Sequence, residues 1–349
     1  MREEETEMST ESAERDSHFF LIGEALGYLY PAVLRAVASV KLADHLADGP
    51  RTAADLAGRT GLDADALYRV LRLLATRGVF EEDAEGRFRL TSLGHALRSD
   101  VPLSARSAIL MLTHATFWQS SGELERCLRK GGTVFDDMFG MPFFEYFAQD
   151  AETAATFHDG MAAMSDWENG PIAAAYHFPE SGVVADVGGG QGGFLLAVLA
   201  RRPGLHGVLY DETHVLAGHR PPGAEISGRW RTAAGDFFTE VPNADVYLLK
   251  RILHDWNDEQ GVTILRNCRR AMAPGGRVLV VDAVVPKGND PHQAKAVDVM
   301  LMGALPGRER TEAEFAGMFA AAGLRLSRVV PTGTVLSIVE GVAADDASG

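Results

Sequence analysis

The segment Asp186-Val187-Gly188-Gly189-Gly190-Gln191-Gly192-Gly193 decides the fold of the second half of the chain. It completes an apolar strand pattern at Val183–Val187 and precedes an apolar helical pattern at Phe194–Ala200. Glycines at such a junction let the backbone turn tightly and approach a ligand closely. A strand, a glycine-rich loop and a helix in this order predict an α/β domain with a doubly wound sheet, in which ligands bind beyond the carboxyl ends of the strands.

Strands and helices continue to alternate after this segment, which predicts a mostly parallel sheet. Further strands are expected at Gly207–Tyr210, Val246–Lys250, Arg277–Val281, Leu324–Val330 and Val335–Glu340. Further helices are expected at Glu259–Met272 and at Thr311–Ala322, where Thr311 is the N-cap and Gly323 ends the helix. Only Pro331-Thr332-Gly333 joins the last two strands, which is too short for a crossover helix, so these strands must be antiparallel neighbours.

Residues 51–99 show the order helix, turn, helix and hairpin, which is typical of a winged helix. Thr52 and Asp63 are the expected N-caps of the two helices, and the hairpin strands are expected at Val79–Glu81 and Arg87–Leu90. This pattern also occurs in DNA-binding proteins. However, residues 51–99 hold eight arginines and no lysine against seven acidic residues. Because a DNA-binding face is usually clearly basic, we expect no contact with nucleic acid.

The predicted helix at Phe20–Val40 has little polar face and needs a covering surface, which a second subunit would supply. Residues 1–18 are acidic and predict a disordered tail, with no apolar core of a signal peptide. We therefore expect the tail at 1–18 and a winged-helix-like dimerisation domain at 19–105. The α/β domain then covers 106–345 and includes a mainly helical segment rich in Met, Phe, Trp and His.

Composition limits the classes of function. The formal net charge of −15 repels nucleic-acid backbones. Cys127 and Cys268 are too few for a disulfide framework or a structural zinc site, and no group of His and acidic residues has metal-ligand spacing. No uninterrupted apolar run reaches about 20 residues, so a membrane span is not expected. A cytoplasmic protein without a metal follows as the expectation.

Three acidic residues and the glycines predict a nucleoside cofactor. Gly188 and Gly190 lie in the loop, Asp211 follows the next strand and can accept hydrogen bonds from ribose hydroxyls, and Asp236 lies in Gly235-Asp236-Phe237-Phe238 after the third strand. NAD and S-adenosylmethionine both fit a glycine loop and one acid. Asp186 at the start of the loop would disfavour a pyrophosphate, and the terminal antiparallel pair is expected of a methyltransferase sheet. S-adenosylmethionine is therefore favoured. The structural alternative is an ordinary turn, with Asp236 as its cap.

Four motifs resemble the caffeate-type O-methyltransferase family, to which bacterial antibiotic-tailoring enzymes belong. In order, they are the glycine loop, Gly235-Asp236-Phe237-Phe238, Leu249–Glu259 with its His254-Asp255-Trp256 core, and Gly307-Arg308-Glu309-Arg310-Thr311. The resemblance covers about residues 19–341 and implies a Rossmann-like class I methyltransferase sheet behind a mainly helical, winged-helix-like dimerisation domain. It further implies S-adenosylmethionine as cofactor, a homodimer, and methylation of a hydroxyl on a small aromatic or quinone metabolite.

The resemblance also implies roles for single residues. Asp211 would bind the ribose, Asp236 and Phe237 the adenine, and Lys250 would lie near the adenine. Two further residues complete the implied cofactor site, Ser165 at the carboxylate end and Trp256 against the adenine ring. The residues implied or suggested for the acceptor site are Phe157, Met161, Met164, Met300, Met302 and Trp118; plain core packing is the alternative for each.

His254 would be the general base, because a histidine with a pKa near 6.5 accepts a proton well when a carboxylate fixes its tautomer. Glu309 is the preferred orienting carboxylate. Asp282 is the second, although the family usually has Glu there and the shorter side chain puts its role in doubt. Helix capping by His254, a surface position for Glu309 and a strand end for Asp282 are the structural alternatives. An NAD-linked oxidoreductase, a metabolite-responsive DNA-binding regulator and a divergent activity such as decarboxylation or hydroxylation remain open.

Overall fold

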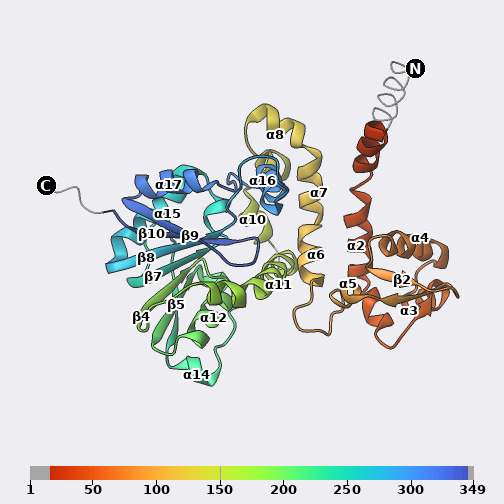
Figure 1. Ribbon diagram of the computed structural model, residues 1–349, viewed down its shortest axis with the longest axis horizontal. Helices are drawn as coiled ribbons and strands as arrows, with labels where there is room; N and C mark the ends of the chain where they lie inside the picture. Colours follow the sequence, from red (N-terminus) through yellow and green to blue (C-terminus); the bar gives the residue numbers. More distant parts are fainter. Residues whose placement is uncertain (1–15, 150, 345–349) are drawn as a thin grey trace, which may run out of the picture. The chain divides into compact units, whose positions relative to one another are not determined.

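The computed structural model describes residues 16–149 and 151–344, so most of the predicted tail, residues 1–15, lies outside it. The chain divides into two compact units, Met1–Thr113 and His114–Gly349 (Figure 1). Residues 16–18 are helical, so the ordered part begins before the expected position 19. The boundary falls after Thr113 because helix α6 (Arg106–Leu112) contacts α2 (Leu29–Ser39), where Arg106 Nε donates to the carbonyl of Ala38 at 2.7 Å.

The first unit has the predicted winged-helix order. Its remaining elements are η1 (Leu42–Leu46), β1 (Arg51–Thr52), α3 (Ala53–Thr60), α4 (Ala64–Ala75), β2 (Phe80–Glu82), β3 (Arg87–Leu90) and α5 (Ser92–His95). Thr52 and Asp63 cap α3 and α4 as expected, and Thr52 forms a reciprocal capping box with Asp55. The antiparallel sheet has the order β1-β3-β2, so the predicted hairpin gains a short third strand.

The N-terminal helical stretch exposes many apolar side chains within this unit. The exposed ones are Phe19, Phe20, Leu21, Ile22, Leu26, Tyr28 and Leu29. In the described part of the chain, Asp16–Ser39 alone has the length and hydropathy of a membrane-spanning helix, and little of it is buried. Those two properties do not distinguish a membrane span from an apolar helix that a second subunit covers.

The second unit contains the predicted α/β sheet, with strand order β6-β5-β4-β7-β8-β10-β9. The strands are β4 (Gly182–Val187), β5 (Leu205–Asp211), β6 (Trp230–Ala234), β7 (Ala244–Lys250), β8 (Met272–Asp282), β9 (Leu324–Pro331) and β10 (Ser337–Ala343). Strands β4 to β8 pair in parallel, whereas β10 is antiparallel to both β8 and β9, which confirms the predicted final pair. This is the class I methyltransferase arrangement expected from the sequence.

Helices pack on both faces of this sheet (Figure 1). On one face α15 (Asp258–Ala271) and α17 (Glu312–Ala321) form a core with the strands, and on the other α12 (Gly193–Arg201) and the end of α11 (Ala151–Ala175) do so. The N-cap of α17 is Thr311, as predicted. Because both faces are covered, the central strands are apolar on both sides and their polar residues gather at their carboxyl ends.

The other helices of this unit precede and follow these elements. They are α7 (Ala115–Gly122), α8 (Leu124–Lys130), α9 (Phe135–Phe139), α10 (Phe143–Phe147), α13 (Thr213–Leu216), α14 (Ala224–Ser227), η2 (Leu253–Asp255) and α16 (Gln293–Ala304). Phenylalanines of α7, α9 and α10 form a separate aromatic core with α16. Cys127 and Cys268 are both buried in helices as free thiols, as expected.

Candidate functional site

The glycine loop after β4 adopts a backbone that only glycine accepts readily. Gly188, Gly190 and Gly192 have φ of 68°, 57° and 80°. A Cβ on Gly188 would lie 2.5 Å from Ile252 Cδ1, and one on Gly192 would lie 2.5 Å from Trp230 Cη2. A Cβ on Gly190 would meet nothing within 4 Å. The loop is therefore held tightly at its two ends and leaves free space at Gly190, where a ligand can approach the backbone.

Two carboxylates flank this loop. Asp211 at the end of β5 accepts hydrogen bonds from the backbone N–H groups of Gly190 and Glu212, both at 2.8 Å. Asp186 in β4 is buried, and its Oδ2 has no hydrogen-bond partner in the described residues. Burial raises the pKa of Asp186 to about 7, against the opposing charge of Lys250. A buried acceptor without a partner marks a place where a ligand donor would be stabilised.

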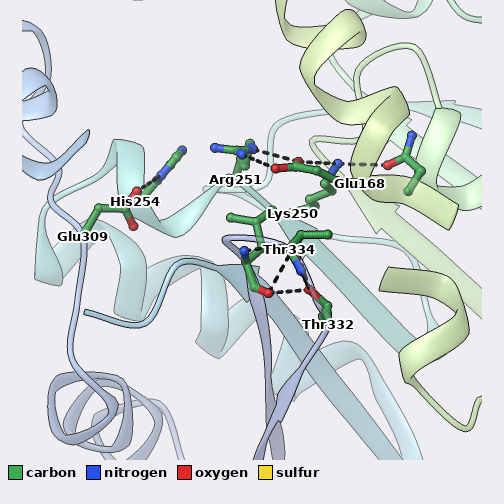
Figure 2. A network of polar contacts seen from close by, with 9 residues as sticks. Glu168, Lys250, Arg251, His254, Glu309, Thr332 and Thr334 are labelled. Atoms are coloured by element: carbon green, nitrogen blue, oxygen red, sulfur yellow. Dashed lines mark hydrogen bonds and ion pairs between the residues drawn. The ribbon is translucent and has the colours of Figure 1, made fainter. Parts of the chain in front are cut away.

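Helix α11 supplies polar groups to the end of β7 (Figure 2). Glu168 accepts from Arg251 at 2.6 Å and lies 3.3 Å from Lys250 Nζ, and Lys250 also donates to Asn169 Oδ1 at 2.9 Å. Burial lowers the pKa of Lys250 to about 8. Arg251 has a φ of 56°, a strained conformation for a side chain other than glycine that is found mainly at functional sites. Lys250 thus contacts α11, and Ser165 lies on the same helix.

His254 lies in η2, and its contact with Glu309 is separate from that of Arg251 with Glu168 (Figure 2). Its Nδ1 is 3.0 Å from Glu309 Oε1, both side chains are buried, and its Nε2 is 3.4 Å from Asp255 Oδ1. Asp282 at the end of β8 is fully buried, but neither of its carboxyl oxygens has a hydrogen-bond partner in the described residues. The helix after η2 is capped by Asn257, so His254 is not its cap.

Burial and neighbouring charges shift the pKa values of His254 and of the carboxylates around it. Burial alone would lower the pKa of His254, but the charges of Asp255 and Asp282 and the hydrogen bond and charge of Glu309 outweigh it and raise the pKa to about 9. Burial raises the pKa of Asp255 to about 7 and that of Asp282 to about 6. A ring fixed by a carboxylate on Nδ1 presents Nε2 for proton transfer.

An aromatic series extends from β6 to α10. Asp236 is exposed and caps its own turn by accepting from the N–H of Phe238 at 2.8 Å. The rings of Phe237 and Phe238 lie 6.0 and 4.8 Å from that of Trp256, which in turn is 5.6 Å from Phe144. The structure therefore brings together two of the predicted adenine-site residues, Phe237 and Trp256, and shows for Asp236 the turn contact that was its structural alternative.

The predicted acceptor residues lie on three helices. Met161 and Met164 are partly buried on α11, Met300 and Met302 are partly buried on α16, and Phe157, Met300 and Phe144 pack against the aromatic core. Trp118 is a partly buried residue of α7. Their surroundings are apolar and rich in rings. Residues with polarisable or flat side chains suit a flat apolar ligand.

Sequence reasoning missed five polar residues of this site. They are Asp166, Glu168, Asn169, Arg251 and Asp255. Asp255 was visible only as part of the His254-Asp255-Trp256 motif. The residues on α11 had no sequence signal, because their partners are more than 50 positions away.

Comparison with known proteins identifies the family. Residues 121–325 match the O-methyltransferase domain and residues 24–100 the O-methyltransferase dimerisation domain. The phenazine O-methyltransferase PhzM of Lysobacter antibioticus is 39% identical over 90% of this chain and 93% of its own. The chain belongs to the O-methyltransferase family. It is an S-adenosylmethionine-dependent O-methyltransferase of the kind found in antibiotic and secondary-metabolite pathways.

Two solved structures are similar to this chain over nearly its whole length. CalO1, a methyltransferase of calicheamicin biosynthesis solved with S-adenosylhomocysteine, is 54% identical, covers 94% of this chain and 98% of its own, and has a TM-score of 0.88. The mitomycin 7-O-methyltransferase MmcR is 33% identical, covers 95% of this chain and 99% of its own, and has a TM-score of 0.87. The residues present here fit S-adenosylmethionine. Gly190 is open to a ligand, Asp186 has an oxygen without a partner among the described residues, and Asp211 adds a second carboxylate, so backbone and carboxylate contacts of the required kinds are present.

Proposed function

We propose that this enzyme methylates a hydroxyl group of a small aromatic or quinone metabolite, with His254 as the general base. The observation that carries this proposal is the buried contact of 3.0 Å between His254 Nδ1 and Glu309 Oε1. A histidine with one nitrogen held by a carboxylate has a fixed tautomer and a stabilised imidazolium, which are the two properties that a base needs.

The cofactor is expected at the carboxyl ends of β4, β5 and β6, where ligands bind in such sheets. Asp211 would hold the ribose, Phe237 and Trp256 would flank the adenine, and Asp186 with Lys250 would lie near the amino-acid portion. This placement of Lys250 replaces the one near the adenine, because its neighbours are Glu168 and Asn169 of α11. The bound cofactor supplies a methyl group on a sulfonium sulfur, which is the electrophile.

The protein's part of the reaction is to position the acceptor oxygen and take its proton. Nε2 of His254 would accept that proton, while Glu309 holds Nδ1. The pKa of about 9 means that the ligand-free ring favours the charged form at neutral pH. We expect this pKa to fall in the cofactor complex, because a second positive charge nearby disfavours the imidazolium. Binding would thus raise the share of neutral imidazole, which is the form that accepts a proton.

The acceptor would lie between α11 and α16, against Phe157, Met161 and Met300. The methionines adapt to the outline of a ring system, and the aromatic side chains favour a flat one. The 7-hydroxyl of a mitomycin precursor is one specific candidate, and the structural likeness to MmcR is compatible with it. The enzyme would act as a homodimer in the cytoplasm.

The test is a screen of hydroxylated quinones and phenols in which release of S-adenosylhomocysteine is measured for the wild type and for His254→Ala. We expect His254→Ala to lower the rate of methyl transfer roughly 10²-fold or more, with cofactor affinity retained. His206→Ala, an exposed histidine of β5, is the matched control. Equal turnover of the two variants would remove His254 from the base role.

Assays on the same purified protein distinguish methyl transfer from the alternative functions. Stabilisation by S-adenosylmethionine but not by NAD in a thermal-shift titration argues against an oxidoreductase. Salt-dependent binding of duplex DNA would support a regulator. Turnover without S-adenosylhomocysteine release would indicate a divergent activity on the same scaffold.

A further inference from the structure

Arg220 connects three segments that surround the glycine loop. Its guanidinium makes a two-pronged contact with Asp166 of α11, at 2.7 and 3.0 Å. Its Nε donates to Gln191 Oε1 at 3.0 Å, and its backbone N–H donates to the carbonyl of Gln191 at 3.0 Å. Arg220 follows α13, and Gln191 is the residue between Gly190 and Gly192. One side chain therefore fastens a helix and the centre of the loop to the segment after β5.

Helix α11 has a second attachment on the other side of the loop. Two residues after Asp166, Glu168 pairs with Arg251 and Lys250 at the end of β7. The same turn of the helix lies against the loop, since a Cβ on Gly193 would lie 3.0 Å from Asn169 Nδ2 and 3.5 Å from Asp166 Oδ1. Helix α11 thus lies against the loop that is expected to hold the cofactor. It is bound to Arg220 on one side of the loop and to Arg251 on the other.

The two attachments differ in exposure. The side chains of Arg251 and Glu168 are 8% and 11% exposed, whereas those of Arg220 and Asp166 are 37% and 27% exposed. Breaking a buried ion pair leaves an uncompensated buried charge and is strongly unfavourable. A partly exposed pair can exchange its partner for water at little cost. The Arg220–Asp166 pair is therefore the attachment that can open while the fold is kept.

We propose that Arg220 is a positioning residue for the cofactor: it holds Gln191 and α11 in place over the glycine loop and so sets how tightly S-adenosylmethionine binds and how fast S-adenosylhomocysteine leaves. This inference rests on the cofactor placement proposed above. Arg220 does not take part in proton transfer. Its removal should act on binding and release and leave the methyl-transfer step at saturating cofactor unchanged.

The test measures the dissociation constant of S-adenosylhomocysteine by calorimetry and its release rate by stopped-flow tryptophan fluorescence. Arg220→Ala and Asp166→Asn should each raise the dissociation constant roughly two- to fivefold, mainly through faster release. The double variant should bind no more weakly than Arg220→Ala, since that substitution already removes the contact with Asp166. Arg220→Lys keeps the charge but not the two-pronged geometry and should recover part of the affinity.

Arg129→Ala is the matched control, because Arg129 forms an exposed ion pair with Glu125 on α8. The inference is overturned if Arg220→Ala and Asp166→Asn bind and release S-adenosylhomocysteine as Arg129→Ala does, or if they slow methyl transfer at saturating cofactor without changing affinity. Asp211→Asn tests the underlying placement separately. If that variant binds as the wild type does, the proposed cofactor site fails; if it loses affinity while Arg220→Ala does not, only the role of Arg220 fails.

Discussion

His254 is surrounded by the carboxylates of Glu309, Asp255 and Asp282, and these charges determine the pKa of its ring. Burying a charged ring is unfavourable unless opposite charges compensate it. Here they overcompensate, and the pKa rises from 6.5 to about 9. Because the folded-state pKa lies above the unfolded one, bound protons stabilise the fold fully below about pH 6.5, and this contribution is lost as the pH rises through 9.

The pKa of His254 should respond to the charge of the bound cofactor. We expect an NMR titration of the ring to give about 9 in the ligand-free enzyme. S-adenosylmethionine should lower this value by about one unit or more, because its sulfonium is positive. S-adenosylhomocysteine has a neutral sulfur and is the matched control, which should lower it less. Equal effects of the two ligands would mean that the ring does not lie near the reactive centre.

The residues of the site differ in how far the sequence could predict them. His254 and Glu309 were predicted because each lies in a motif of its own, although they are 55 positions apart. Asp282 was predicted with doubt, and it makes no hydrogen bond to the ring. Glu168 could not be predicted, because a carboxylate on a weakly amphipathic helix has no pattern that reveals its partner Arg251.

At the scale of elements, the loop between β4 and α12 has a backbone conformation that requires glycine at several positions. Gly192→Ala should destabilise the fold by roughly 2 kcal/mol or more, because a left-handed φ costs an alanine 1–2 kcal/mol and its Cβ would overlap Trp230. Gly223→Ala is the control, since Gly223 has a φ of −62° and open space around it. Urea unfolding with and without S-adenosylhomocysteine measures both stability and binding. A Gly192→Ala protein as stable as Gly223→Ala would show that the loop is not so constrained.

The elements of the sheet were predictable because each has an apolar run between clear end signals. Thr311 and Gly323 marked the two ends of α17, and Pro331-Thr332-Gly333 marked the antiparallel pair. The short helices between α6 and α11 were not delimited. Their phenylalanines face one another across several helices, so no single helix shows a clean period. Strand β1 was missed because two residues are too short for any pattern.

At the scale of the molecule, the exposed apolar helix at the N-terminus needs a partner. Leu26 is 56% exposed within a dimerisation domain. Leu26→Glu should weaken the homodimer, because it would place a charge in a desolvated contact. Leu128→Glu is the control, since Leu128 is 72% exposed on α8 outside that domain. Sedimentation at micromolar concentration should show a dimer for the wild type and the control. A monomeric wild type would refute the prediction.

The account depends most on where the cofactor binds, and a crystal structure with S-adenosylhomocysteine tests this directly. We expect the ribose hydroxyls at the carboxylate of Asp211, the nucleoside against the backbone at Gly190, and the sulfur on the side of the loop that faces Nε2 of His254. A nucleoside bound elsewhere, or a His254 ring turned away from the sulfur, would contradict the account.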